Sequence, residues 1–167
     1  AGTIKFKGKD ISKAEKSFKN SIGVVFDEGF FYDELTLTQM KNLIASSYSH
    51  WDNGAYTHYL DAFSLRPDQT ISSLSRGMKM KFSLALALSH HAELIMDEPT
   101  SGLDPLVRKQ FIEILKEFMV QGGKAVFYST HNTSDLDKAA DMLVMIDNGK
   151  ILFEEDKDML LETHRLV

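Results

Sequence analysis

Two adjacent carboxylates, Asp97 and Glu98, directly follow the short apolar run of Leu94, Ile95 and Met96. Such a run suits a parallel strand buried on both faces, and the carboxylates would then lie at its carboxyl end. Ligands bind at that edge of open α/β sheets. One carboxylate could hold Mg²⁺, which prefers a few carboxylates together with waters and substrate phosphates, while the other orients or deprotonates a water. The pair therefore predicts chemistry on a phosphate-bearing ligand.

The neighbouring residues indicate how this site would be framed. Pro99 favours an extended backbone at Glu98, so the Glu98 side chain is expected to project outward. Farther upstream, Ser75 is a good N-cap, and Gly77 would let another molecule approach the first turn of the following helix closely. Because helix amino termini bind anions, a second phosphate-contacting surface is expected there.

Three motifs follow one another closely: LSRGM at residues 74–78, LIMDEP at 94–99 and SGLDP at 101–105. They resemble the LSGGQ signature, the Walker B strand with its catalytic glutamate, and the D-loop of the nucleotide-binding domains of ABC transporters. The resemblance extends over essentially all 167 residues, and LSRGM with the segment 129–151 looks most similar to bacterial export-type ATPases. It implies an α/β fold, a truncated P-loop NTPase (RecA-like) core with a mostly parallel sheet plus a helical subdomain.

The resemblance implies ATP and Mg²⁺ as cofactors and gives roles to single residues. Glu98 would be the general base or water-orienting group, and Asp97 would contact Mg²⁺. His131 follows the strand expected at residues 124–128 and would contact the γ-phosphate. Ser75, Gly77 and the start of the signature helix would meet phosphates that are held by a second domain.

Other candidate site residues have more than one possible role. Asp104 would communicate across the dimer and also suits the N-cap of the next helix. Arg76 and Met78 replace the second glycine and the glutamine of LSGGQ; Arg76 could add a cation near phosphate or merely cover the turn. Asp27 stands where the family carries the Q-loop glutamine. It could meet a hydrated Mg²⁺ but cannot donate a hydrogen bond as an amide does, and it could equally be part of a surface turn.

The phosphate-binding loop GxxxxGK[ST] does not occur in these 167 residues. Gly-Lys pairs occur at residues 8–9, 123–124 and 149–150, and none has the required sequence around it. We therefore expect the chain alone not to bind ATP more tightly than about 100 μM. Ala1 is not an initiator methionine, so a cropped, processed or engineered piece of a longer protein is expected.

Composition limits the class of protein. With 43% hydrophobic and 26% charged residues, the chain is typical of one soluble domain. A formal net charge of −5 argues against nucleic acid as a partner. Cysteine is absent, which excludes disulfides and thiolate sites. No apolar run approaches the roughly 20 residues that cross a bilayer, so a membrane role would come through another protein.

The expected organisation is a truncated α/β ATPase core formed by residues 1–34 and 92–167, with a helical subdomain at 35–91 that includes the signature motif. Buried strands are expected at residues 22–26, 94–96 and 124–128, and a hairpin around the Asp-Asn-Gly of residues 147–149. Two helices are expected within residues 36–62, the second after a turn at Asn53-Gly54. The aromatic residues Phe30, Phe31 and Tyr32 are interpreted as core, with an exposed docking patch as the alternative.

The favoured function is the ATP-hydrolysing subunit of an ABC transporter. It would power transport through a partner transmembrane permease, pack head to tail with a second nucleotide-binding domain, and lie in the cytoplasm against the inner face of the cell membrane. One alternative is a soluble ABC-type ATPase associated with ribosomes or DNA. Another is a non-catalytic fragment that retains a dimerisation or docking surface.

Overall fold

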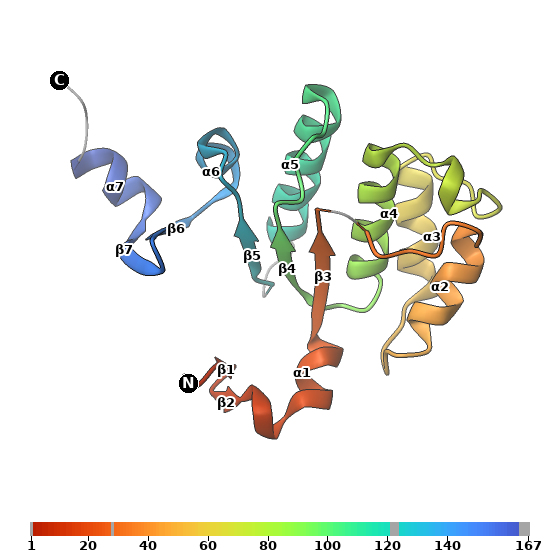
Figure 1. The fold of residues 1–167 in the computed structure, drawn as a ribbon, viewed down its shortest axis with the longest axis horizontal. Coiled ribbons are helices and arrows are strands. Elements are labelled where there is room, and N and C mark those ends of the chain that lie inside the picture. Colours follow the sequence, from red (N-terminus) through yellow and green to blue (C-terminus); the bar gives the residue numbers. More distant parts are fainter. Residues whose placement is uncertain (1, 28, 121–123, 164–167) are drawn as a thin grey trace.

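The computed structural model describes residues 2–27, 29–120 and 124–163 (Figure 1). In chain order its elements are β1 (Lys5–Phe6), β2 (Lys9–Asp10), the 3-10 helix η1 (Ile11–Lys13), α1 (Glu15–Ser21), β3 (Ile22–Phe26), α2 (Leu37–Ala45), α3 (Asn53–Ala62), the 3-10 helix η2 (Ile71–Ser73), α4 (Arg76–Leu88), β4 (Glu93–Asp97), α5 (Pro105–Val120), β5 (Val126–Ser129), α6 (Thr133–Ala139), β6 (Met142–Asp147), β7 (Lys150–Asp156) and α7 (Lys157–Thr163).

A three-stranded parallel sheet in the order β3-β4-β5 positions the carboxylates. Val24 pairs with Ile95, and Ile95 pairs with Phe127, so the three strands run in step. Their carboxyl ends therefore meet at one edge, as Figure 1 shows for the three arrowheads. The mostly parallel α/β architecture predicted from the motifs is confirmed.

One face of this sheet is buried by helices. Met96 and Leu94 of β4 are each 1% exposed and belong to a core that includes Phe82 of α4 and Leu115 of α5. In β3, Gly23 lies directly against Ala87 of α4. The buried face of α4 is thus the surface that contacts the sheet.

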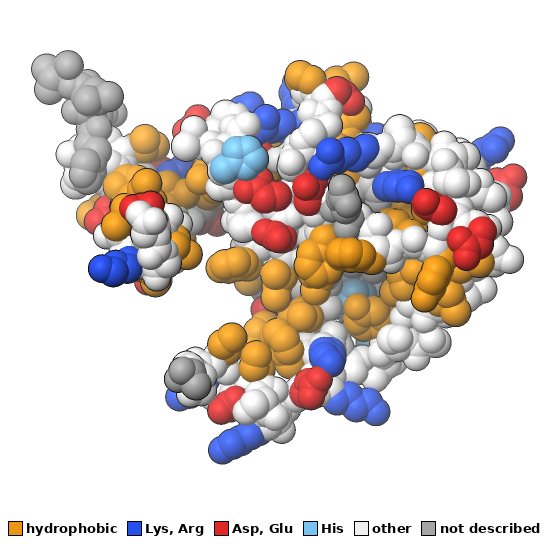
Figure 2. Space-filling model, in the orientation of Figure 1, with side chains coloured by type: hydrophobic (Ala, Val, Ile, Leu, Met, Phe, Trp, Pro, Cys, Tyr) orange, Lys and Arg blue, Asp and Glu red, His pale blue; other side chains and the backbone are white. Residues whose placement is uncertain are grey.

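The other face is open among the described residues. Val24, Phe26 and Phe127 are 37%, 43% and 67% exposed. The sequence predicts buried strands at residues 22–26 and 124–128, which is wrong for the side chains on this face, because no described helix covers it. Hydrophobic side chains gather over the sheet on the face shown in Figure 2.

The helices at residues 36–62 begin with side-chain caps. Thr36 and Gln39 form a complete capping box at the start of α2. Asp52 caps α3, accepting a hydrogen bond from the Ala55 amide. Asn53 and Gly54 are the first residues of α3, so the turn predicted there is wrong. Because Asp52 caps the helix, α3 begins at Asn53, closer to the amino terminus than predicted.

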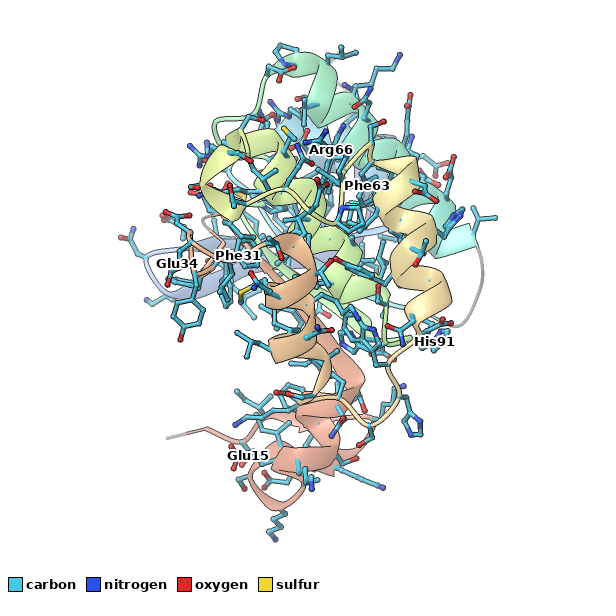
Figure 3. The ribbon with its side chains drawn as sticks, turned by 90° about the vertical axis from the view of Figure 1, so that its right-hand side faces the viewer. Glu15, Phe31, Glu34, Phe63, Arg66 and His91 are labelled. Carbon is cyan, nitrogen blue, oxygen red and sulfur yellow. The ribbon has the colours of Figure 1, made fainter. Side chains whose placement is uncertain are left out.

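The aromatic loop after β3 divides between core and surface (Figure 3). Phe31 packs against the core, with its ring centroid 5.2 Å from that of Phe82. Phe30 and Tyr32 are 81% and 61% exposed. The core interpretation is right for Phe31 and wrong for its two neighbours.

The C-terminal part contains the predicted hairpin. β6 and β7 pair antiparallel, and Asn148 and Gly149 adopt the positive φ angles of 47° and 74° that the tight turn requires. The predicted end of α5 near Gly122-Gly123 lies outside the described residues. No helix of the described chain is long and apolar enough to span a bilayer.

Candidate functional site

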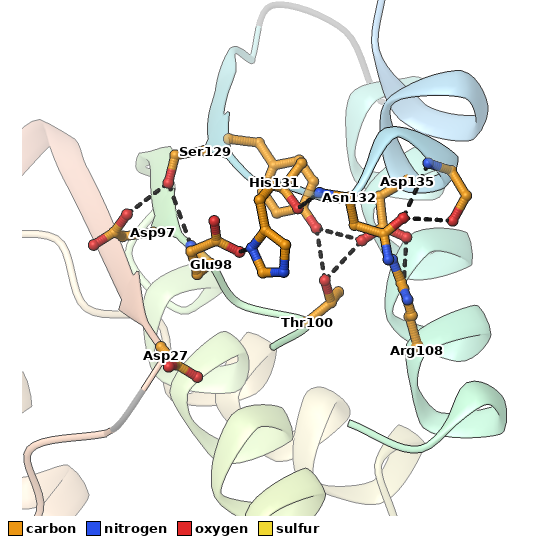
Figure 4. Close-up of polar contacts among 12 residues, drawn as sticks. Asp27, Asp97, Glu98, Thr100, Arg108, Ser129, His131, Asn132 and Asp135 are labelled. Carbon is orange, nitrogen blue, oxygen red and sulfur yellow. Dashed lines mark hydrogen bonds and ion pairs between the residues drawn. The ribbon is translucent and has the colours of Figure 1, made fainter. Parts of the chain in front are cut away.

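The carboxyl edge of the sheet gathers polar groups from neighbouring strands (Figure 4). Asp97 ends β4 and pairs in register with Ser129, which ends β5. The Ser129 hydroxyl donates a hydrogen bond of 2.6 Å to Asp97 Oδ1. One oxygen of the Asp97 carboxylate is thereby fixed in direction at the edge where the sequence places the site.

Glu98 has an unusual backbone. Its φ of 47° lies in the left-handed region, so the extended conformation expected from the following Pro99 is wrong. The Glu98 amide donates to both the carbonyl and the hydroxyl oxygen of Ser129, at 3.1 and 3.3 Å, and the Ser101 amide donates to the Glu98 carbonyl at 3.0 Å. These bonds outweigh a local preference of about 1–2 kcal/mol against this conformation.

Glu98 and His131 are in direct contact. His131 follows β5, and its Nδ1 donates to Glu98 Oε2 at 2.8 Å. The Glu98 side chain is 30% exposed and the His131 side chain 78%, so the pair is open to solvent. On the face shown in Figure 2, acidic side chains lie beside a histidine. Because His131 contacts only one oxygen of the Glu98 carboxylate, the other oxygen is suited to accept a proton from a bound water.

A buried polar cluster lies behind this pair. Asp135 of α6 is 1% exposed and accepts hydrogen bonds from the hydroxyls of Thr100 and Tyr128, at 2.7 and 2.9 Å. Arg108 of α5 donates from Nε to Asp135 Oδ1 at 2.7 Å. Burial by itself raises the pKa of the Asp135 carboxyl, but these three donors outweigh it, and the pKa lies below its ordinary value. Burial raises the pKa of Tyr128 to about 12, so its hydroxyl remains a donor at neutral pH.

The sequence did not single out this cluster. Asp135 and Asp137 both lie on α6, and only the fold shows that Asp135 is buried whereas Asp137 is exposed. Arg108 lies one turn into α5, the helix that follows the SGLDP motif. Its i, i+4 spacing from Asp104 would have suggested a pair with Asp104, whereas the structure pairs Arg108 with Asp135.

The signature segment begins α4 as predicted. The Ser75 hydroxyl accepts from the Met78 amide at 3.2 Å, which confirms the N-cap. A Cβ added at Gly77 would lie 3.2 Å from Val107 Cγ1, so the close approach at this glycine is made by α5 of the same chain. Met78 packs against the core.

Arg76 and Asp27, which both differ from the family motifs, contact each other. Arg76 Nη2 forms an ion pair with Asp27 Oδ1, and the same guanidinium lies over Gly102, whose φ is 64°. Both side chains are roughly half exposed. Asp27 therefore has a specific partner in Arg76. Asp104, in turn, caps α5 through the amides of Leu106 and Val107, which confirms its structural role.

The carboxylates at this edge of the sheet suit Mg²⁺ only when phosphate oxygens help to complete its coordination. Within residues 2–27, 29–120 and 124–163, no cluster of three or more acidic, histidine or cysteine side chains could hold a metal ion. Asp97 offers a directed carboxylate, and Asp27 is engaged by Arg76. Mg²⁺ commonly takes one or two carboxylates and completes its shell with waters and phosphate oxygens, and Asp97 suits that arrangement.

Comparison with known proteins gives consistent matches. The family model described as ABC transporter matches residues 1–101. The bacitracin transport ATP-binding protein BcrA of Bacillus licheniformis is 29% identical over 168 residues, covering 99% of this chain and 55% of that protein. A solved ATP binding subunit of an ABC transporter has a TM-score of 0.84 at 25% identity, covering 98% of this chain and 70% of that one.

A second solved structure shares the fold. It is a dimeric ATP-binding cassette in a post-hydrolysis state bound to ADP and Pi, with a TM-score of 0.78 at 19% identity, covering 93% of this chain and 73% of that one. The chain spans about half the length of the first curated relatives it matches.

Proposed function

The chain belongs to the ABC transporter family of ATP-binding domains, and on that premise we propose that it is part of an ATPase subunit that powers transport through a membrane permease. The observation that carries the proposal is the contact between Glu98 and His131 at the carboxyl edge of the sheet. A paired carboxylate and imidazole beside a directed Asp97 suit the hydrolysis of a phosphate anhydride.

Glu98 acts on the attacking water in this proposal. His131 holds Oε2 of the carboxylate, and Oε1 has no hydrogen-bond partner among the described residues. Oε1 is therefore free to accept the water proton or to orient the water. Asp97 would hold Mg²⁺ together with phosphate oxygens, and the metal would supply charge neutralisation at the phosphates. The exposed imidazole of His131 would face the γ-phosphate.

ATP would be shared between two copies of the domain packed head to tail. The phosphates bound by one domain would meet Ser75 and the amino terminus of α4 in the other, since helix amino termini favour anions. A dimeric relative of the same fold that holds ADP and Pi supports this arrangement. These 167 residues contain no GxxxxGK[ST] sequence, so we propose that they bind ATP weakly by themselves.

Transport is proposed from relatives named as transport ATP-binding proteins, such as BcrA. The permease would be a separate membrane-embedded chain, and the ATPase would lie on the inner face of the cell membrane. The formal net charge of −5 fits this better than a nucleic-acid partner. The resemblance of LSRGM and residues 129–151 to bacterial export-type ATPases supports a role in transport.

The test is ATP turnover by the full natural protein with Glu98→Gln. We expect turnover to fall by roughly 10²- to 10⁴-fold, the range for losing a general base. Glu34→Gln, at an exposed residue outside the site, is the matched control and should leave turnover unchanged. Wild-type turnover in Glu98→Gln would move the catalytic role to another group.

A further inference from the structure

We propose that Asp135 is a positioning residue, which keeps Glu98 and His131 in contact by tying together the two loops that carry them. Thr100 lies two residues after Glu98, and Asp135 lies four residues after His131. The Thr100 hydroxyl and Asp135 Oδ2 are 2.7 Å apart, which closes the link between the loops. The catalytic consequence of this link rests on the proposed ATPase function.

The loop after β4 needs such a tie. Glu98 is held in a left-handed conformation that persists only where the surroundings fix it. Thr100 is 5% exposed and its hydroxyl contacts both Tyr128 and Asp135, at 3.0 and 2.7 Å. These contacts act together with the hydrogen bonds between Glu98 and Ser129, so their loss would weaken the restraint that keeps Glu98 out of the extended region.

The position of His131 also depends on the Asp135 carboxylate. Its side chain is 78% exposed, so packing does little to fix the ring. The loop instead leads into α6, which Asn132 caps by accepting from the Ser134 amide at 3.0 Å. Asp135 secures this short helix to α5 through Arg108 and to β5 through Tyr128. The location of His131 thus follows from where Asp135 holds α6.

The chemistry of the cluster favours a carboxylate at this site. A carboxylate accepts hydrogen bonds only, and the hydroxyls of Thr100 and Tyr128 and the guanidinium of Arg108 all donate to it. A charge buried to this degree is stable only when it is paired and hydrogen-bonded. The three donors come from three separate segments, so one side chain orders the loop after β4, α5 and β5 together.

The spectroscopic test follows the imidazole signals of His131 in the full natural protein labelled with ¹⁵N-histidine. His131→Gln assigns the signals, and Glu98→Ala, which removes the acceptor, shows where they lie when the contact is lost. We expect Asp135→Ala and Thr100→Val to move the His131 signals towards the Glu98→Ala values. Thr100→Ser keeps the hydroxyl and should restore the wild-type spectrum.

Two controls separate positioning from general destabilisation. Asp137→Asn changes an exposed carboxylate on the same helix and should leave the His131 signals in place. Thr100→Val is nearly isosteric and leaves the Arg108–Asp135 ion pair intact, so it provides a folded variant even if Asp135→Ala does not fold. Unmoved His131 signals in folded Thr100→Val would overturn the proposal.

The kinetic test uses ATP turnover by the same variants. We expect Thr100→Val to lower kcat by about 10- to 100-fold with little change in KM, as small misplacements of reacting groups do. If the wild-type protein shows no ATP turnover, the proposed function fails. If Glu98→Gln abolishes turnover while Thr100→Val keeps wild-type kcat, the positioning inference alone fails.

Discussion

His90 is buried where β3 meets the end of α4, and both of its ring nitrogens face backbone carbonyl oxygens. Nδ1 lies 3.2 Å from the Leu86 oxygen and Nε2 lies 3.0 Å from the Ile22 oxygen. The ring stacks on Tyr48 at a centroid distance of 3.8 Å. Burial lowers the pKa of His90, and the two carbonyl groups oppose that effect only in part. A neutral imidazole has a single N–H, so it donates to only one of the two.

This environment predicts a pH dependence of folding stability. Below about pH 6.5 the unfolded chain protonates His90 while the folded chain resists, so the free energy of unfolding should fall as the pH falls. One such group contributes a slope of at most about 1.4 kcal/mol per pH unit. Urea unfolding between pH 5 and pH 8 measures it.

The control for this prediction is a second histidine. His90→Gln should flatten the slope between pH 5 and pH 6.5, whereas His58→Gln, at an exposed residue of α3, should retain it. A slope that persists in His90→Gln would assign the pH dependence to other groups.

Single residues of the site were predictable by type and by strand position, but their pairings were not. Parallel strands bring their carboxyl ends to one edge, which correctly placed Asp97, Glu98 and His131 near one another. The Pro99 rule failed at Glu98, because hydrogen bonds to Ser129 are tertiary contacts that a local preference does not include.

Among the elements, β3 and α4 approach each other unusually closely at Gly23. A Cβ built there would lie 2.8 Å from the Ala87 carbonyl oxygen and 2.9 Å from Ala87 Cβ. Real Cβ atoms do not tolerate such distances, so a side chain would force the helix away from the sheet. Glycine at this point is therefore a packing requirement of the α4–β3 contact.

Gly23→Ala is accordingly expected to lower the free energy of unfolding by about 1–3 kcal/mol, the usual cost of overpacking a core. Denaturant unfolding checks it. Gly54→Ala is the matched control: a Cβ there meets only the end of the Asp52 side chain at 3.2 Å, and alanine suits α3 better than glycine. Equal losses in the two variants would contradict the packing argument.

Three helix starts and the tight turn were predictable because their causes are local, whereas the start of α3 at Asn53 was not. Thr36, Ser75 and Asp104 cap helices as their sequences indicate, and Asn148-Gly149 turns the hairpin. Strand burial was not predictable, since an apolar strand has the same composition whether one face or both are covered. Val24 and Phe127 show the difference.

At the scale of the whole molecule, the Arg76–Asp27 ion pair connects the start of α4 with the end of β3. The pair is roughly half exposed, so solvent screens it and its contribution to stability is small. A double-mutant cycle of Arg76→Ala and Asp27→Ala should give a coupling free energy of about 0.2–1 kcal/mol at low salt. Denaturant unfolding provides the four values.

Salt distinguishes a charge interaction from packing at this link. In about 1 M NaCl the coupling should shrink towards zero, because the Debye length falls to about 3 Å. A coupling unchanged by salt would contradict a charge interaction between Arg76 and Asp27.

The parallel pairing of β3 with β4 governs the order in which the chain folds. All of α2, α3 and α4 lies between these strands in the sequence, so the strands can meet only by closing a long loop. Loop closure costs entropy, and distant contacts slow folding. Helices α3 and α4 contact each other, so we expect them to collapse first and to shorten the effective loop. Amide protons of α4 should therefore become protected from exchange earlier during refolding than those of β3, and the site at the sheet edge would be the last part to assemble.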